Sequence, residues 1–103
     1  MSQLIPLVSI FDLAEGEVAA GSVMGEDILL CCVEGQYYAV ANRCSHASQR
    51  LSTGRLVGHE IRCPLHGASF DVRTGACTGA PAQHPIKTFP VRLEGGKVCV
   101  SIL

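Results

Sequence analysis

Two short motifs, Cys44-x-His46 and Cys63-x-x-His66, contain the side chains of this chain that are best suited to bind a metal centre. Each motif supplies one thiolate and one imidazole, and residues 47–62 lie between them. Together they can offer two sulfurs to one metal ion and two nitrogens to another. That division suits a 2Fe-2S cluster in which two Cys bind one iron and two His bind the other. The pattern predicts these cluster ligands: Cys44, His46, Cys63 and His66.

The same four side chains could instead close a tetrahedron around one zinc ion, as in structural Cys2His2 sites. Zinc modules usually place a pair of Cys in one element and a pair of His in another. Here each motif mixes the two ligand types, and the Cys-x-His spacing is too tight for the helix of a zinc finger. The spacing therefore favours an iron–sulfur cluster, with a zinc-stabilised interaction module as the alternative.

Short strands separated by turn signals are expected to position these motifs. Glu34-Gly35 is typical of a two-residue hairpin turn, and residues 94–96, Glu-Gly-Gly, indicate another hairpin. Asp12 is expected to cap a single helical turn, with Glu15 completing a capping box. Outside the middle of the chain, the predicted strands cover residues 5–10, 17–23, 27–33, 36–41, 91–93 and 97–102, with a turn at Gly25-Glu26-Asp27.

The middle segment, rich in Gly, Pro, Cys and His, interrupts this strand pattern. Within it, residues 54–57 and 60–62 are expected to form a hairpin that turns at Gly58-His59. Such a hairpin brings both motifs to one tip, as a shared cluster requires. We predict an all-β fold with an antiparallel sandwich or barrel base. The expected single domain, 1–103, has its base at about 1–41 and 86–103 and an inserted cluster-binding subdomain at about 42–85.

Composition narrows the class of protein. A chain of 103 residues is expected to form one domain, and no apolar run approaches the roughly 18 residues of a transmembrane helix. The first residues lack a basic region and a cleavage site for export, so the six cysteines are expected to be reduced thiols in the cytoplasm. The net charge of −1 disfavours nucleic acid and anionic membranes as partners.

The stretch CSHASQRLSTGRLVGHEIRCPLHGASFDVRTGACTGAP, which begins at Cys44, resembles the Rieske family. It looks most like the soluble Rieske ferredoxins of bacterial aromatic-ring-hydroxylating dioxygenase systems, and the resemblance covers roughly residues 33–103. It implies a β base that carries two liganding loops at the tip of a small subdomain. It also implies one Rieske-type 2Fe-2S cluster with two Cys and two His ligands.

In such systems the ferredoxin passes single electrons from an NAD(P)H-dependent flavin reductase to a terminal oxygenase. The resemblance therefore implies an electron carrier with these two protein partners, and we expect a monomer. The chain lacks a nucleotide-binding fingerprint and room for a mononuclear iron domain, so an autonomous enzyme is not expected. The alternative function is that of a small Rieske subunit in an assimilatory nitrite reductase.

Departures from the high-potential Rieske proteins of respiratory complexes imply a low reduction potential. Those proteins carry an extra Cys in each ligand loop, joined as a disulfide, where this chain has Gln49 and Leu65. They also place Ser and Tyr hydroxyls near the cluster, where this chain has Ala68 and Phe70. Since hydrogen bonds to sulfur raise the potential, we expect roughly −150 mV, at the low end of the Rieske range.

The remaining Cys and His residues have structural interpretations. Cys31 and Cys32 are expected to be buried thiols on opposite faces of one strand. Cys99 alternates with valines in the last strand and is expected in the core. Cys77 follows the cluster loops without a ligand role, and His59 is expected at a solvated hairpin tip.

Overall fold

The computed structural model describes residues 3–44, 49–64, 68–79 and 84–102. The predicted all-β class is confirmed, because the described helical structure consists of two 3-10 turns, η1 (Ile10–Asp12) and η2 (Leu51–Thr53). Neither could cross a membrane. The strands are β1 (Gln3–Ser9), β2 (Val18–Val23), β3 (Glu26–Val33), β4 (Gln36–Ala41), β5 (Arg55–Val57), β6 (Glu60–Arg62), β7 (Ser69–Asp71), β8 (Cys77–Gly79), β9 (Thr88–Phe89), β10 (Val91–Glu94) and β11 (Lys97–Ile102).

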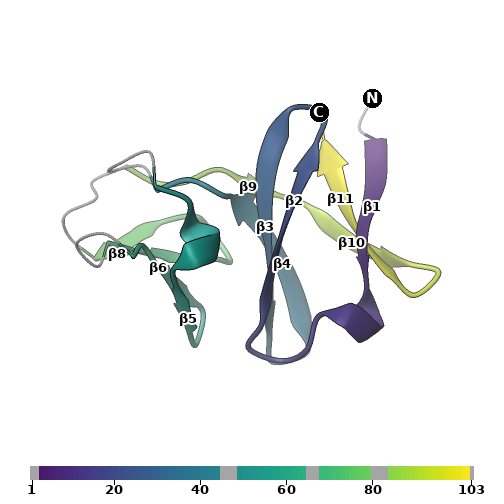
Figure 1. Ribbon diagram of the computed structural model, residues 1–103, viewed down its shortest axis with the longest axis horizontal. Coiled ribbons are helices and arrows are strands. Elements are labelled where there is room, and N and C mark those ends of the chain that lie inside the picture. Colours follow the sequence, from purple (N-terminus) through teal and green to yellow (C-terminus); the bar gives the residue numbers. More distant parts are fainter. Residues whose placement is uncertain (1–2, 45–48, 65–67, 80–83, 103) are drawn as a thin grey trace.

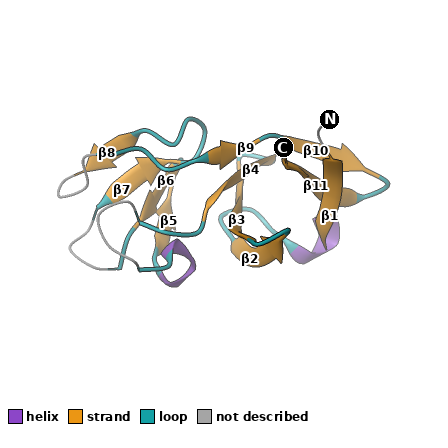
Figure 2. Ribbon diagram, turned by 90° about the horizontal axis from the view of Figure 1, so that it is seen from above, coloured by secondary structure: helices purple, strands orange, loops and turns teal. Residues whose placement is uncertain are grey.

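The strands form three antiparallel sheets (Figure 1). We call β1-β11-β10 the base sheet, β2-β3-β4-β9 the central sheet and β5-β6-β7-β8 the cluster sheet. Figure 2 shows the base sheet and the cluster sheet at opposite ends of the molecule, with the central sheet between them. The cluster sheet is built from the residues between β4 and β9, so it is inserted into the chain of the central sheet.

Strand β3 is buried on both faces and belongs to two hydrophobic cores. Its odd-numbered residues from 29 to 33, Cys31 among them, pack with residues of the cluster sheet. Its even-numbered residues from 28 to 32, Cys32 among them, pack with residues of the base sheet. Successive side chains of a strand point to opposite faces, so the continuous apolar run of β3 serves both cores. The predicted opposite orientation of the two neighbouring cysteines is confirmed.

Two tight turns join the first three strands of the central sheet. Glu34 and Gly35 both have positive φ, 53° and 75°, as a two-residue type I′ hairpin requires. The preceding hairpin uses Met24 and Gly25 in the same way, with φ of 49° and 82°. The predicted turn at residues 25–27 is therefore displaced by one residue, because Gly25 takes the second turn position and Glu26 already begins β3.

The predicted helix cap at Asp12 is wrong. The 3-10 turn begins earlier, and Ser9 caps it by accepting a hydrogen bond from the Phe11 N–H at 3.2 Å. The Glu15 carboxylate instead accepts the backbone N–H groups of both residues of the 34–35 turn, at 2.6 and 2.9 Å. These two hydrogen bonds hold the pKa of Glu15 below its usual value.

Short strands in the middle of the chain, β7, β8 and β9, were not predicted from the sequence. Each has only two or three residues and depends on its neighbours for hydrogen bonds. The last two residues of the return from the cluster sheet to β9 are held by backbone hydrogen bonds. The Ile86 N–H donates to the Gly75 carbonyl at 2.9 Å, and the Ala41 N–H donates to the Lys87 carbonyl at 2.8 Å. These bonds tie the inserted segment to the central sheet.

Replacing Gly75 with alanine should destabilise the protein more than the same change at Gly16. Both glycines have nearly the same positive φ, 80° and 79°, so both variants incur the left-handed penalty of about 1–2 kcal/mol. A Cβ at Gly75 would also collide with the Ile86 carbonyl oxygen, whereas a Cβ at Gly16 meets nothing. We expect G75A to lower the free energy of unfolding by a further 1–3 kcal/mol or so in denaturant titrations. Equal losses would contradict the close approach at Gly75.

Glu15 should make the stability of the protein sensitive to acid. Its pKa is lower in the folded state than in the unfolded chain, so its stabilising effect is complete above the unfolded value. The effect is lost as the pH falls through the folded value. We expect the stability difference between wild type and E15Q to shrink as the pH is lowered from about 6 to 3. The control E94Q removes an exposed carboxylate from another hairpin. Parallel pH profiles for wild type and E15Q would overturn the assignment.

Candidate metal centre

The first predicted ligand loop follows β4 and is closed by a backbone hydrogen bond. The Cys44 N–H donates to the Gln49 carbonyl at 2.9 Å, which brings together the two ends of the segment 44–49. The Cys44 side chain is 2 % exposed and points into the core. His46, the second ligand predicted in this loop, lies outside the described residues.

The second loop, between β6 and β7, is closed in the same manner. The Cys63 N–H donates to the Ala68 carbonyl at 2.6 Å, and the Cys63 side chain is 3 % exposed. His66 also lies outside the described residues. In both loops the cysteine N–H donates to the carbonyl of the residue five positions later in the chain. The two loops therefore share one backbone closure although their Cys-to-His spacings differ, and sequence reasoning did not foresee this.

The two predicted cysteine ligands enter the same hydrophobic core. Cys44 and Cys63 both belong to the cluster of buried residues between the central sheet and the cluster sheet. All six cysteines are thiols rather than disulfides. Two buried sulfurs that open equivalent loops suit the thiolate half of a 2Fe-2S site, so the two cysteines fit this cofactor. Within the described ranges no three Cys, His, Asp or Glu side chains gather elsewhere as a rival metal site.

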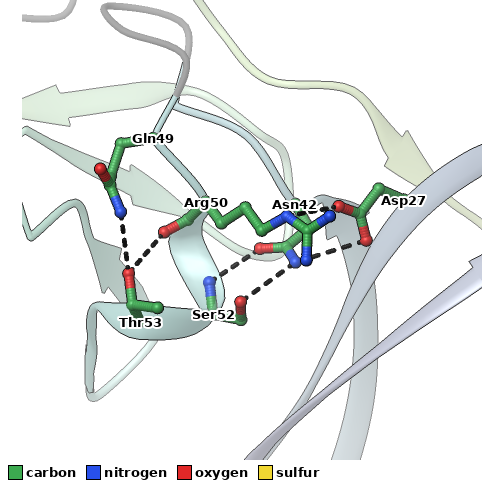
Figure 3. Close-up of polar contacts among 6 residues, drawn as sticks. All are labelled: Asp27, Asn42, Gln49, Arg50, Ser52 and Thr53. Atoms are coloured by element: carbon green, nitrogen blue, oxygen red, sulfur yellow. Dashed lines mark hydrogen bonds and ion pairs between the residues drawn. The ribbon is translucent and has the colours of Figure 1, made fainter.

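A polar network anchors the first loop to the central sheet (Figure 3). Asn42, just before the loop, is 1 % exposed. Its side-chain oxygen accepts the Ser52 N–H at 2.7 Å, and its amide nitrogen donates to the Ser52 hydroxyl at 3.2 Å. The same nitrogen reaches an Asp27 carboxylate oxygen at 3.5 Å, and the Asn42 N–H donates to the Asp27 carbonyl at 2.9 Å. Asn42 thus links β3, the start of the loop and η2.

The far limb of the loop is attached to the same carboxylate. The Arg50 guanidinium lies 3.2 Å from the other Asp27 oxygen, and the Arg50 carbonyl accepts the Thr53 hydroxyl at 3.0 Å. The Gln49 amide donates to that hydroxyl at 3.2 Å. Asp27 therefore holds the residues on both sides of the loop. This role could not be predicted from neighbouring residues, because the only local signal is an asparagine directly after an apolar strand.

The other cysteines are structural. Burial, with a smaller effect of the adjacent Cys32, raises the pKa of Cys31 to about 12, so Cys31 remains a protonated thiol. Burial also raises the pKa of Cys32. Cys99 is buried in β11, as predicted. Cys77 is half-buried in β8 opposite Phe70, and its thiol donates to the Gly79 carbonyl at 3.4 Å.

The expected solvated position of His59 is only partly correct. Its ring is half-buried and packs edge-on against Tyr38 of the central sheet, with 6.0 Å between ring centroids. Its carbonyl accepts the Val72 N–H at 2.8 Å. Nearby, hydrogen bonds from the Arg73 side chain lower the pKa of Asp71. The tip of the β5–β6 hairpin thus contacts the central sheet.

Ala68 and Phe70, the positions without hydroxyl groups, are both fully buried in the core that contains Cys44 and Cys63. Ala68 supplies the carbonyl that closes the second loop. Phe70 lies opposite Ile61 in β6. Both side chains are therefore apolar members of this core.

Comparison with known proteins agrees with this architecture. The model of the Rieske [2Fe-2S] domain matches residues 3–90. The ferredoxin component of the naphthalene 1,2-dioxygenase system of Pseudomonas aeruginosa is 43% identical over 98 residues, which cover 95% of this chain and 94% of that protein. The chain also resembles the solved ferredoxin of carbazole 1,9a-dioxygenase from Nocardioides aromaticivorans IC177, with a TM-score of 0.92, 33% identity and coverage of 95% and 96%.

Two further solved structures bear on partners and on the alternative function. A complex of reduced oxygenase and oxidized ferredoxin in carbazole 1,9a-dioxygenase contains a chain that matches with a TM-score of 0.88 and 30% identity, over 97% of this chain and 92% of that one. A structure named for an NADH-dependent nitrite reductase small subunit from Mycobacterium tuberculosis has a TM-score of 0.89 at 16% identity, with coverage of 100% and 97%, which shows the fold alone. By its two closed loops, its shared cysteine core and these matches, the chain belongs to the Rieske [2Fe-2S] domain family.

Proposed function

We propose that this protein is a one-electron carrier, the ferredoxin component of an aromatic-ring dioxygenase system. The observation that carries the proposal is the pair of equivalent loops, each opened by a buried cysteine and closed by that cysteine's own N–H. When bound, a Rieske cluster supplies one reversibly exchanged electron. The chain contributes the ligands, the hydrogen-bonded loops that hold them and the apolar residues around them. It is not itself the oxygenating enzyme.

In this proposal Cys44 and Cys63 bind one iron, and His46 and His66 bind the other. The two thiolates would lie on the core side of the site, since both cysteine side chains are almost fully buried. The Asp27 network holds the first loop, and the β6–β7 pairing holds the second. Hydrogen-bonded support of this kind orients metal ligands and preserves their geometry.

A low reduction potential follows from the side chains around the second loop. Ala68 and Phe70 carry no hydroxyl that could donate to sulfur, and their burial keeps the surroundings apolar. Gln49 and Leu65 occupy the positions where a loop disulfide would need cysteines. Fewer hydrogen bonds to the cluster sulfurs favour the oxidised, less negative state, so the potential should lie near −150 mV or so.

The proposed partners are an NAD(P)H-dependent flavin reductase as donor and a terminal Rieske oxygenase as acceptor, with the carrier acting as a monomer in the cytoplasm. Two findings support these partners. The similar protein from Pseudomonas aeruginosa is named as the ferredoxin component of a dioxygenase system. A solved complex contains a ferredoxin together with the oxygenase of carbazole 1,9a-dioxygenase. The nitrite reductase subunit has weaker support, because its similarity at 16% identity extends to the fold alone.

A visible and EPR spectrum before and after dithionite tests the cofactor. We expect a brown protein whose reduced form gives a rhombic signal with low average g, typical of a cluster with mixed Cys and His ligation. C44A, C63A, H46A and H66A should each abolish that signal, whereas C99A, which removes a buried cysteine from the base sheet, should retain it. A colourless, zinc-containing protein that takes up no iron and sulfide would contradict the proposal.

Restoring the missing hydroxyl groups should raise the reduction potential. The double variant A68S/F70Y places potential hydrogen-bond donors at two buried positions beside the second loop, and such donors stabilise the reduced cluster. We expect protein-film voltammetry to show a shift toward positive potential. F89Y is the matched control, because Phe89 is also buried but packs in the core of the base sheet. A potential unchanged in A68S/F70Y, or shifted equally in F89Y, would refute the explanation.

A further inference from the structure

Two arginines face each other across the β5–β6 hairpin. Arg55 and Arg62 are directly opposed partners in the antiparallel register, and both are exposed. Directly opposed residues project from the same face of a sheet, with Cβ atoms roughly 4.5–5.5 Å apart. The next pair, Leu56 and Ile61, points to the other face, where Ile61 is fully buried. The two guanidinium groups therefore occupy the outer face of the cluster sheet.

This pair has no ion-pair partner among the described residues. The two ion pairs there join Arg50 to Asp27 and Arg73 to Asp71. Glu60 lies on the same face, diagonal to Arg55 and two residues before Arg62. The ion pairs of the described residues do not include one between Glu60 and either arginine. Two like charges thus lie side by side, and no residue in the described part of the chain forms an ion pair with either.

The backbones beside the two arginines lie close together. A Cβ at Gly54 would collide with the Arg62 carbonyl oxygen, so the chain before Arg55 lies tightly against Arg62. Like charges directly opposite each other destabilise an antiparallel pair. Local features that lower stability are expected mainly at functional sites. An anionic group from another molecule would convert the repulsion into a favourable interaction.

The position of the two arginines indicates that the molecule carrying this anionic group exchanges electrons with the protein. Arg62 immediately precedes Cys63, the buried residue that opens the second loop. Figure 1 shows β5 and β6 at the end of the molecule opposite β1. A protein that exchanges electrons with the proposed cluster must approach this end. Two guanidinium groups can each form paired hydrogen bonds with a carboxylate.

We propose that the twin arginines Arg55 and Arg62 form a docking site for carboxylate side chains on the surface of an electron-transfer partner. This inference rests on the proposed function and names the chemistry of the partner surface. The net charge of −1 makes the pair a local feature rather than part of a generally basic surface, which argues against nucleic acid as the occupant. Charged pairs at the rim of such a contact mainly increase the rate of association.

A charged small oxidant can test the local potential without the natural partner. The dithionite-reduced holoprotein, freed of excess reductant, transfers one electron to hexacyanoferrate(III), which becomes hexacyanoferrate(II), and stopped-flow absorbance records the rate. At low ionic strength we expect R55E/R62E to slow this anionic oxidant about tenfold. The variant should accelerate the cationic oxidant hexaamminecobalt(III). Added salt should reduce both differences.

The matched control is R92E/K97E, which changes the net charge equally at exposed positions of the base sheet. It should alter either rate much less than R55E/R62E does, because the base sheet lies at the opposite end of the molecule from the cluster sheet and the interaction between charges weakens with distance. Hexaglutamate, as a carboxylate probe, should slow oxidation of the wild type by hexacyanoferrate(III) and leave R55E/R62E unaffected. R55Q/R62Q should lie between wild type and R55E/R62E.

Three results would overturn the inference: equal effects in the control, no inhibition of the wild type by hexaglutamate, or stronger inhibition by oligothymidylate than by hexaglutamate. The EPR spectrum of each variant is recorded first, to show that its cluster is intact. Loss of the Rieske signal in the wild type itself would refute the proposed function. An intact signal with any of the three results refutes only the docking site.

Discussion

The rest of the structure depends on strand β3, which is buried on both faces and has to satisfy two cores at once. Because side chains alternate along a strand, residues 28–32 can pack toward the base sheet at even positions and toward the cluster sheet at odd ones. Removing a buried methylene group costs stability in either core. The two ends of the molecule are therefore joined through packed side chains rather than through a flexible linker.

The two predicted ligand loops adjoin this packed layer. Cys44 and Cys63 lie in the same core as the odd-numbered side chains of β3, so the packing that supports the fold also confines the two sulfurs. Each cysteine uses its own N–H to close its loop, and Asp27 of β3 is linked to residues on both limbs of the first loop. Ligands held in this way need little rearrangement when the charge of the bound group changes, which is what an electron carrier requires.

The buried face and the exposed face of the cluster sheet influence different properties of the protein. The inner side is apolar, with Ile61 and Phe70 fully buried. These side chains pack in the same core as Cys44 and Cys63. The outer side carries the opposed pair Arg55 and Arg62. A low-dielectric interior affects the potential of a metal centre, whereas exposed charges chiefly affect the rate and choice of partner. Substitutions on the two sides should consequently change different measurable properties.

Local features of the sequence were sufficient for the turns that depend on a few neighbouring residues. The hairpins at 34–35 and 58–59, the opposite faces of Cys31 and Cys32 and the buried Cys99 could all be predicted, because glycine-containing turns and strand alternation are local properties. The ligand set remains a prediction that rests on the two motifs.

Features that require distant segments to meet could not be predicted from the sequence. Glu15 could not be assigned to the 34–35 turn, nor Asn42 to Ser52, from neighbouring residues, since each contact joins different elements. The short strands β7, β8 and β9 have too few residues to show an alternating pattern in the sequence. They form because neighbouring strands provide their hydrogen-bond partners. The sequence by itself therefore predicted which residues could bind a cluster and located the hairpins at 34–35 and 58–59. Packing around β3 decided how the loops are held, because that depends on contacts between residues far apart in the chain.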